Sequence, residues 1–300
     1  MLKELEKQKN CQVKNVNDVF GKQFYSVVVM QTLNFCQLGT DWNVKLSRNG
    51  VNFLGRHISY CMFSIHPDYV LRGDGVFGVN SVFFAGRWSE TIFFNSINSS
   101  DVRIKSFVYG TPRFEKILQS RVSFPIGHRK TILWCPCHGK SSIYFFWDQM
   151  DFLCKYFRVI LKIHPSSFLE DNCLRGIILS HRGIELDEVS EASELFPEAD
   201  FVFCDTGGSV FSAIYCDKNV LFLNTPDVPL RYPEIQLREE IINFDRNCSG
   251  EEILESLRNT SIWEKQRVIR RRIKERFFAI SDEPASKKIA RKLVEFLDET

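Results

Sequence analysis

The chain has 300 residues, of which 44% are hydrophobic, so it is long enough to bury one large core or two smaller ones. Its formal net charge of +2 argues against a nucleic-acid-binding protein with a strongly basic face. Ten cysteines are scattered with no secretory signal before them, and no apolar run approaches the roughly 20 residues that span a bilayer. We therefore expect a cytoplasmic protein, with two domains as the preferred division.

The first part of the chain predicts a small α/β domain over residues 12–125. Its predicted strands are 24–30, 81–85 and 106–109, and its predicted helix is 89–95. The polar, glycine-containing segment 125–130 then predicts a domain boundary.

Strands and helices alternate over residues 126–284, which is the order expected of a parallel sheet with helices on both faces. The predicted strands are 131–135, 158–163, 176–180, 200–204 and 220–223. The predicted helices are 142–155, 166–173, 188–196, 208–216, 250–259, 263–278 and, beyond this domain, 285–297. This pattern predicts a doubly wound second domain.

The most informative segment runs from a buried strand through the turn Thr206-Gly207-Gly208-Ser209 into a helix and a second buried strand. Free amide N–H groups and the helix dipole at such a turn favour an anion beside Thr206 and Ser209. Asp205 ends the first strand, and we expect it to orient the turn rather than to touch a ligand. The alternative is a hydroxyl that caps the helix without any ligand.

A second motif, Lys162-Ile163-His164-Pro165, also stands at a strand end. Ligands of doubly wound sheets lie outside the carboxyl ends of the strands. We therefore expect Lys162, His164 and the turn to converge on one site, although either side chain can instead be structural.

This pairing of K-x-H-P with a downstream Asp-Thr-Gly-Gly turn resembles the CDP-glycerol glycerophosphotransferase and capsule-polymer transferase group. Residues 108–114 resemble its G-x-P-R-[FY] element, and residues 132–136 resemble the strand that opens its second domain. The resemblance covers roughly residues 80–245. It implies a GT-B fold of two Rossmann-like α/β domains, the first one small, with C-terminal helices of which residues 285–300 pack back on the first domain.

The resemblance implies a transferase that moves a glycerol-phosphate or sugar unit from a nucleotide-activated, CDP- or CMP-based donor to a surface-polymer or lipid-linked acceptor. It implies catalytic roles for His164 and Lys162 and supporting roles for Asp205, Arg113 and Glu234. The turn would bind the donor phosphates. We predict no metal and no other cofactor, because the helix terminus, Lys162 and His164 already supply positive or hydrogen-bonding groups.

One departure from the group and two other hypotheses leave alternatives open. The segment Gln31–Asn34 lacks the histidine of the group's early His-Gly-Thr motif, so the catalytic base is not located. A UDP-sugar 2-epimerase of the same fold is suggested by the segments 205–208 and 231–234, although residues 210–213 lack the acidic groups that such enzymes place there. A non-catalytic nucleotide- or polymer-binding scaffold subunit is the third hypothesis.

Two further patterns have a functional and a structural interpretation. Cys135-Pro136-Cys137-His138 offers two sulfurs and an imidazole, but no second ligand pair supports a zinc site. The basic residues of 263–278 can lie on an anionic membrane surface, which would make the protein peripheral on the inner face of the plasma membrane. A solvated charged face is the structural alternative.

Overall fold

The structure is a computed structural model that describes residues 80–96, 104–115, 129–226 and 236–299, together with the backbone of two strands at 25–30 and 55–61. Within these ranges the description leaves out residues 140, 165, 172, 182, 189 and 191 and the side chains of 96, 169, 170 and 193.

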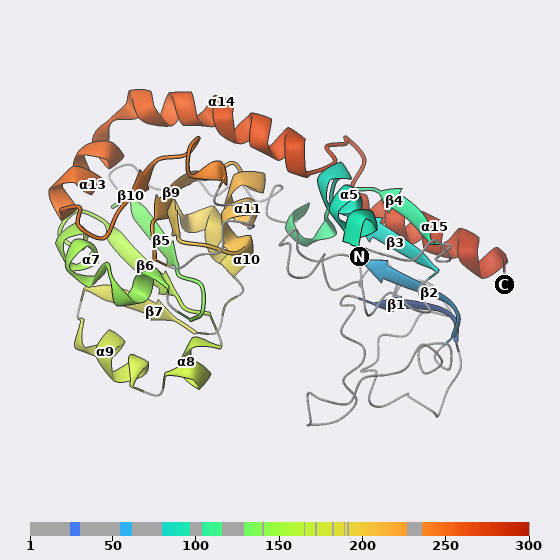
Figure 1. Ribbon diagram of the computed structural model, residues 1–300, viewed down its shortest axis with the longest axis horizontal. Helices are drawn as coiled ribbons and strands as arrows, with labels where there is room; N and C mark the ends of the chain where they lie inside the picture. The colour runs from blue at the N-terminus through green and yellow to red at the C-terminus, as the bar shows by residue number, and fades with distance from the viewer. Residues whose placement is uncertain are drawn as a thin grey trace. The chain divides into compact units, whose positions relative to one another are not determined.

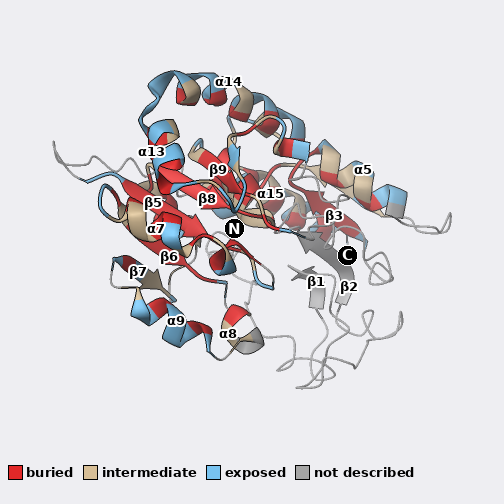
Figure 2. Cartoon of the chain, turned by 60° about the vertical axis from the view of Figure 1, so that its left-hand side comes forward, coloured by how far each residue is buried: buried red, intermediate tan, exposed pale blue. Residues whose placement is uncertain are grey.

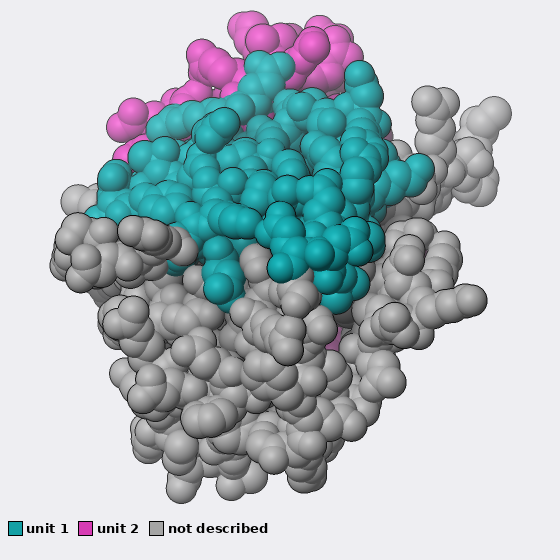
Figure 3. All heavy atoms as spheres, turned by 90° about the vertical axis from the view of Figure 1, so that its right-hand side faces the viewer, with its two compact units in different colours: residues 1–115, 275–300 teal, residues 116–274 magenta. Residues whose placement is uncertain are grey.

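The chain divides into two compact units (Figure 3). Unit 1 comprises residues 1–115 and 275–300, and unit 2 comprises residues 116–274. The C-terminal helix α15 (Ala285–Asp298) thus belongs to the same unit as the first 115 residues, whereas α14 (Thr260–Phe277) begins in unit 2 and ends in unit 1. The predicted boundary near residue 125 lies outside the described residues.

Unit 1 contains a four-stranded parallel sheet in the order β1-β2-β3-β4. The strands are β1 (Tyr25–Met30), β2 (Gly55–Cys61), β3 (Ser81–Phe84) and β4 (Lys105–Val108). Phe83 packs with Ile289, Leu293 and Phe296 of α15, while Phe84 meets Phe93 of α5 (Arg87–Ser96) edge-on at 5.2 Å. Successive residues of β3 therefore point to opposite covered faces of the sheet.

The turn after β3 packs directly against the backbone that follows α14. The N–H of Ala279 donates to the carbonyl of Ala85 at 2.8 Å, and the Trp88 ring lies 5.1 Å from that of Phe277. A methyl carbon on Gly86 would lie 2.0 Å from the carbonyl oxygen of Phe277, so this position has room only for hydrogen. The C-terminal segment is thereby fixed to the centre of unit 1.

Unit 2 contains a six-stranded parallel sheet in the order β10-β9-β8-β5-β6-β7 (Figure 1). The strands are β5 (Thr131–Cys135), β6 (Arg158–Lys162), β7 (Ile184–Asp187), β8 (Phe201–Cys204), β9 (Asn219–Leu223) and β10 (Asn243–Phe244). The helices are α7 (Trp147–Leu153), α8 (Ser167–Glu170), α9 (Leu174–Ser180), α10 (Ala192–Leu195), α11 (Gly208–Tyr215) and α13 (Gly250–Arg258). The 3₁₀ turns in the described residues are η2 (Pro112–Phe114) in unit 1, and η3 (Ser142–Tyr144) and η4 (Phe196–Glu198) in unit 2.

Both faces of the central strands are buried (Figure 2). Alternate residues such as Trp134, Leu161 and Phe203 pack in one core with side chains from α7, α9 and α13. The intervening residues, such as Leu133 and Val202, are equally inaccessible, and α11 packs against β8 and β9. This double coverage explains why the strands are continuous apolar runs without polar alternation.

One predicted strand is wrong. Residues 176–180 form the second half of α9, and the strand is β7, which lies a few residues later. Leu174 and Ile178 are buried while Leu179 is 67% exposed, which is the i, i+4 pattern of an amphipathic helix. A short apolar run is ambiguous between the two states, and packing against the sheet decided it.

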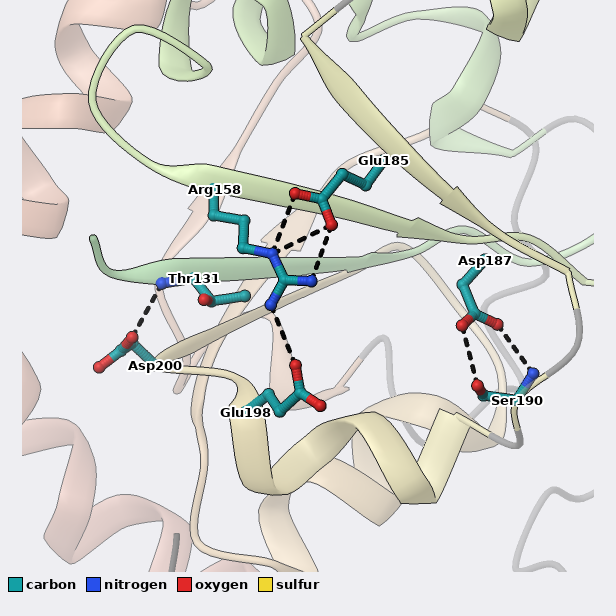
Figure 4. A network of polar contacts seen from close by, with 7 residues as sticks. All are labelled: Thr131, Arg158, Glu185, Asp187, Ser190, Glu198 and Asp200. Atoms are coloured by element: carbon teal, nitrogen blue, oxygen red, sulfur yellow. Dashed lines mark hydrogen bonds and ion pairs between the residues drawn. The ribbon is translucent and has the colours of Figure 1, made fainter. Parts of the chain in front are cut away.

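Ion pairs gather at the amino-terminal edge of the sheet (Figure 4). The guanidinium of Arg158 binds Glu185 through Nε and Nη2 and Glu198 through Nη1 at 3.0 Å. Nearby, Asp200 accepts from the N–H of Thr131 at 2.8 Å. These groups join the starts of neighbouring strands, so we expect this edge to contribute to stability and to leave the opposite edge for ligands.

Helix α14 is fixed to unit 2 by buried polar groups. The amide of Gln266 accepts from the N–H of Val220 and donates to its carbonyl, and Arg270 binds Asp217 and Asn219. Arg270 is therefore a structural residue with a side chain only 4% exposed, although the sequence groups it with the basic residues of this helix. Burial lowers its pKa from the usual value.

The close approach at Gly86 generates a stability prediction. The Gly86→Ala substitution should lower the free energy of unfolding by about 2 kcal/mol or more, because the new methyl group meets rigid backbone. Gly176→Ala is the matched control: it meets no atom within 4 Å and lies in α9, so it should be neutral or stabilise by up to about 1 kcal/mol. Thermal unfolding of both variants by circular dichroism checks this, and equal midpoints would contradict it.

Candidate functional site

The chain reverses its direction of sheet growth between β5 and β8. From β5 the strands continue outward through β6 to β7, and the chain then returns to place β8 on the other side of β5. The connections that leave the carboxyl ends of β5 and β8 therefore run in opposite directions along the sheet. Doubly wound sheets bind ligands at this topological switch point.

A buried carboxylate joins the two loops at the switch point. Oδ1 of Asp205 accepts from the N–H groups of Cys137 at 2.9 Å and Thr206 at 2.6 Å, and Oδ2 accepts from the N–H of Ser142 at 2.6 Å. Burial raises the pKa of Asp205, and the bonds from Ser142, Cys137 and Thr206 oppose that shift. The side chain is fully buried, and its hydrogen bonds join the glycine turn to the loop after β5.

The hydroxyl of Ser142 extends this connection into the core. It accepts a hydrogen bond from Nε1 of Trp134 at 3.0 Å, and its side chain also bonds to Asp205. Trp134 is fully buried in β5. The start of the loop and its end at η3 are consequently both fixed to the sheet.

The glycine turn brings the first residues of α11 close to that loop. Gly207 is the N-cap of the helix with φ of +88°, a conformation that side chains rarely adopt, and a methyl carbon there would lie 3.4 Å from Sγ of Cys137. Since the N-cap residue is a glycine, it has no side chain with which to cap α11. The side chain of Ser209 instead bonds to the thiol of Cys204, whose pKa burial raises.

The helix therefore presents backbone N–H groups at its amino end. The first turn of any helix has N–H groups with no acceptor inside the helix, and the helix dipole adds partial positive charge there. Thr206, Gly208 and Ser209 are all partly accessible at this point. This arrangement suits an anion such as a phosphate.

His164 follows β6 and is exposed beside the loop that follows β5. Its ring lies 4.8 Å from the ring of His138 at an interplanar angle of 42°. The N–H of Ser166 donates to its Nδ1 at 3.2 Å. The structure thus brings the K-x-H-P motif and the Cys135–His138 motif together, which sequence reasoning had treated separately.

Lys162 has a partner within the sheet. Its Nζ lies 3.6 Å from Oδ1 of Asp187 at the end of β7 and donates to the Asp187 carbonyl at 3.4 Å. Burial raises the pKa of Asp187, but hydrogen bonds from Ser190 and the charge of Lys162 outweigh it and lower the pKa overall. Lys162 is only 8% exposed, so much of its charge is balanced by this ion pair.

Arg238 is a cation at this site that the sequence analysis missed. Its Nη2 donates to the backbone carbonyl of Asp205 at 3.1 Å, and its guanidinium lies over the ring of Phe222 at 5.8 Å. The sequence analysis had singled out Glu234, four residues earlier, which lies outside the described residues. Arg238 has no motif of its own, so only its contact with Asp205 reveals it.

The remaining predicted residues lie elsewhere. Arg113 is exposed in unit 1, in the short 3₁₀ turn that follows β4, where Phe114 is buried.

Burial raises the pKa of Cys135 to about 12, so its thiol is protonated and behaves as an apolar group. In the described parts of the chain, no three His, Cys, Asp or Glu side chains gather as metal ligands would. Nor does any described helix have the length and apolar character to cross a membrane.

Comparison with known proteins finds the fold but no family. No family model and no curated protein matches the chain. Among solved structures, a variant of the wall teichoic acid polymerase TagF matches with a TM-score of 0.62 and 14% identity, over 91% of this chain and 73% of that one. A putative UDP-N-acetylglucosamine 2-epimerase from Listeria monocytogenes matches with a TM-score of 0.59 and 15% identity, over 95% and 77%.

A third structure, S. aureus MnaA with UDP, matches with a TM-score of 0.59 and 14% identity, over 92% of this chain and 76% of that one. Identities this low establish a shared fold and leave the reaction undetermined. The predicted fold class is confirmed: the chain has parallel α/β sheets of the Rossmann-like, GT-B type.

The role of Asp205 in joining the two loops can be tested by stability. Asp205→Asn should lower the free energy of unfolding by about 1–3 kcal/mol, because its NH₂ group would face a buried N–H donor. Asp200→Asn is the matched control at the other end of β8: Asp200 accepts the N–H of Thr131 at a partly buried site, and its substitution should cost less than about 1 kcal/mol. Denaturant unfolding measures both, and equal costs would show that Asp205 does not join the loops.

Proposed function

We propose that this chain is a GT-B transferase that moves a glycerol-phosphate or sugar unit from a nucleotide-activated donor, of the CDP or CMP class, to a lipid-linked or surface-polymer acceptor. The observation that supports this is the junction at Asp205. It fixes the amino end of α11 and the loop after β5 together at the switch point. The pyrophosphate of a nucleotide donor is the kind of anion that such a helix terminus stabilises.

Ligands of the structural neighbours support the donor class. TagF was soaked with CDPG, and S. aureus MnaA was solved as a co-structure with UDP. In our proposal this chain takes a donor of the same chemical class, with its phosphates at Thr206, Gly207, Gly208 and Ser209. The N–H groups of the turn would provide most of the contact, because the Ser209 side chain is bonded to Cys204.

The side chains around the turn have distinct roles in this proposal. His164 is exposed at the end of β6 and would donate a hydrogen bond to the donor phosphate or the leaving nucleotide. Arg238 would add positive charge beside the turn, whereas Lys162 would act mainly through its ion pair with Asp187. Arg113 and Glu234 remain proposed supporting residues.

The proposed reaction needs charge stabilisation at the leaving group more than covalent chemistry. As the bond to the transferred unit breaks, negative charge increases on the nucleotide phosphate, and preorganised N–H donors stabilise that charge. An acceptor at a membrane would suit a cytoplasmic protein that approaches the inner face of the plasma membrane through residues 263–278.

A UDP-sugar 2-epimerase is the second candidate, because epimerase structures match this chain nearly as well as TagF does. The two reactions differ in product. A transferase releases free nucleotide from its donor, whereas an epimerase returns a donor sugar with inverted configuration at C2. Chromatography of the nucleotide products distinguishes them.

Ligand-induced stabilisation tests the nucleotide site. CDP or CDP-glycerol at 100 times its Kd should raise the free energy of unfolding by about 2.7 kcal/mol, because it binds only the folded chain. The gain should vanish in the Gly207→Ala/His164→Ala variant, whose turn is strained and whose imidazole is lost. Thermal shift with CMP, CDP, CDP-glycerol, UDP and UDP-sugars measures this.

Arg158→Ala provides the matched control. It removes the ion pairs at the opposite edge of the sheet, so it should lower the unfolding temperature but keep the nucleotide-induced increase. Stabilisation by uridine nucleotides alone would favour the epimerase. The transferase proposal fails if no nucleotide stabilises the native chain, and a scaffold role would then replace it.

A further inference from the structure

Two histidines meet at the carboxyl edge of the sheet in unit 2. His138 comes three residues after β5 and His164 two residues after β6, and these strands are neighbours in which Trp134 pairs with Leu161. Their rings are 4.8 Å apart, and both residues are exposed. The contact therefore does not arise from burial in the core.

We propose that His138 is a second contact for the donor phosphate and acts together with His164. This inference rests on the proposed function, because it concerns the ligand of the same site. His138 would donate a hydrogen bond from its imidazole N–H to a phosphate oxygen. It would thus extend the anion site from the amino end of α11 to the ends of β5 and β6.

The hydrogen bonding of His164 supports a donor role for the pair. Because Nδ1 of His164 accepts from the N–H of Ser166 at 3.2 Å, the hydrogen of the neutral ring is on Nε2. An N–H group of this kind can donate to a phosphate oxygen, which only accepts hydrogen bonds. Two adjacent imidazoles repel when both are protonated, so an anion beside them would relieve that repulsion.

The backbone places His138 within the same site. Cys137, the residue before it, donates its N–H to Asp205 at 2.9 Å and brings its Sγ close to the Gly207 cap. Ser142, at the end of the loop, donates to the other oxygen of Asp205 at 2.6 Å. His138 is thus carried by a short loop that is tied at both ends to the residue preceding the phosphate turn, which is the preorganisation that a ligand contact requires.

A third histidine shows what a structural role looks like in this fold. His181 stacks on Trp147 with ring centroids 4.3 Å apart and an interplanar angle of 7°, and its Nδ1 lies 2.7 Å from Oδ2 of Asp151. It precedes β7 and so lies at the amino-terminal edge of the sheet. His181→Ala therefore serves as the control variant for histidine loss away from the site.

The contact can be measured by calorimetry on the full chain with CDP, UDP, cytidine, uridine and inorganic pyrophosphate. His138→Ala should weaken the binding of the diphosphate that the native chain prefers by about tenfold, the loss expected for one hydrogen bond to a charged group. Binding of the matching nucleoside should change less than about twofold, because it has no phosphate. His181→Ala should leave both affinities unchanged.

Two further substitutions separate a direct contact from support of His164. His138→Gln keeps an N–H donor and should retain most of the affinity for the diphosphate, whereas His138→Phe keeps only the ring contact and should be as weak as His138→Ala. If His138→Phe restores the native affinity, His138 merely braces His164 and the inference is overturned. The exposed position of His138 means that these variants should fold normally, which thermal unfolding verifies.

The remaining outcomes separate this inference from the proposed function. If the native chain binds a nucleoside diphosphate and His138→Ala binds it equally well, the histidine contact is wrong while the nucleotide site stands. If the native chain binds pyrophosphate in a His138-dependent manner but no nucleotide, the phosphate contact stands and the transferase proposal fails. Absence of binding to both nucleotides and pyrophosphate overturns both.

Discussion

The candidate site depends on one buried carboxylate. Asp205 accepts N–H groups from its own turn and from both ends of the loop after β5, and it is shielded completely from water. A buried carboxylate without such donors would be strongly unfavourable, so the backbone must bring them to it. The same requirement fixes the amino end of α11 beside the loop that carries His138. The geometry of the candidate site is thus a consequence of satisfying one charge.

The two edges of the second sheet have different roles. At the amino-terminal edge, carboxylates balance Arg158 and join the starts of neighbouring strands. At the carboxyl edge, Lys162 is matched by Asp187, and two exposed imidazoles and the guanidinium of Arg238 gather near the turn. An anionic ligand would complete the arrangement.

Sequence reasoning identified most strands of unit 2 because they are apolar runs buried on both faces, and the segment 131–135 has the predicted limits. It failed at 176–180, where the same apolar character belongs to a helix with one exposed side. It gave no separate strand for β10, a two-residue strand that pairs with β9. Predictions from local composition are least reliable where an element is short and its state depends on the surface against which it packs.

By itself the sequence determined the fold class, the glycine turn before α11 and the position of His164 at a strand end, because these follow from burial patterns and glycine spacing along a continuous segment. The tertiary structure alone decided which distant groups meet. It placed His138 against His164, paired Lys162 with Asp187, and brought Arg238 to the carbonyl of Asp205. Such contacts depend on the order of the strands in the sheet. That order brings together residues that are far apart in the chain and that no local sequence pattern links.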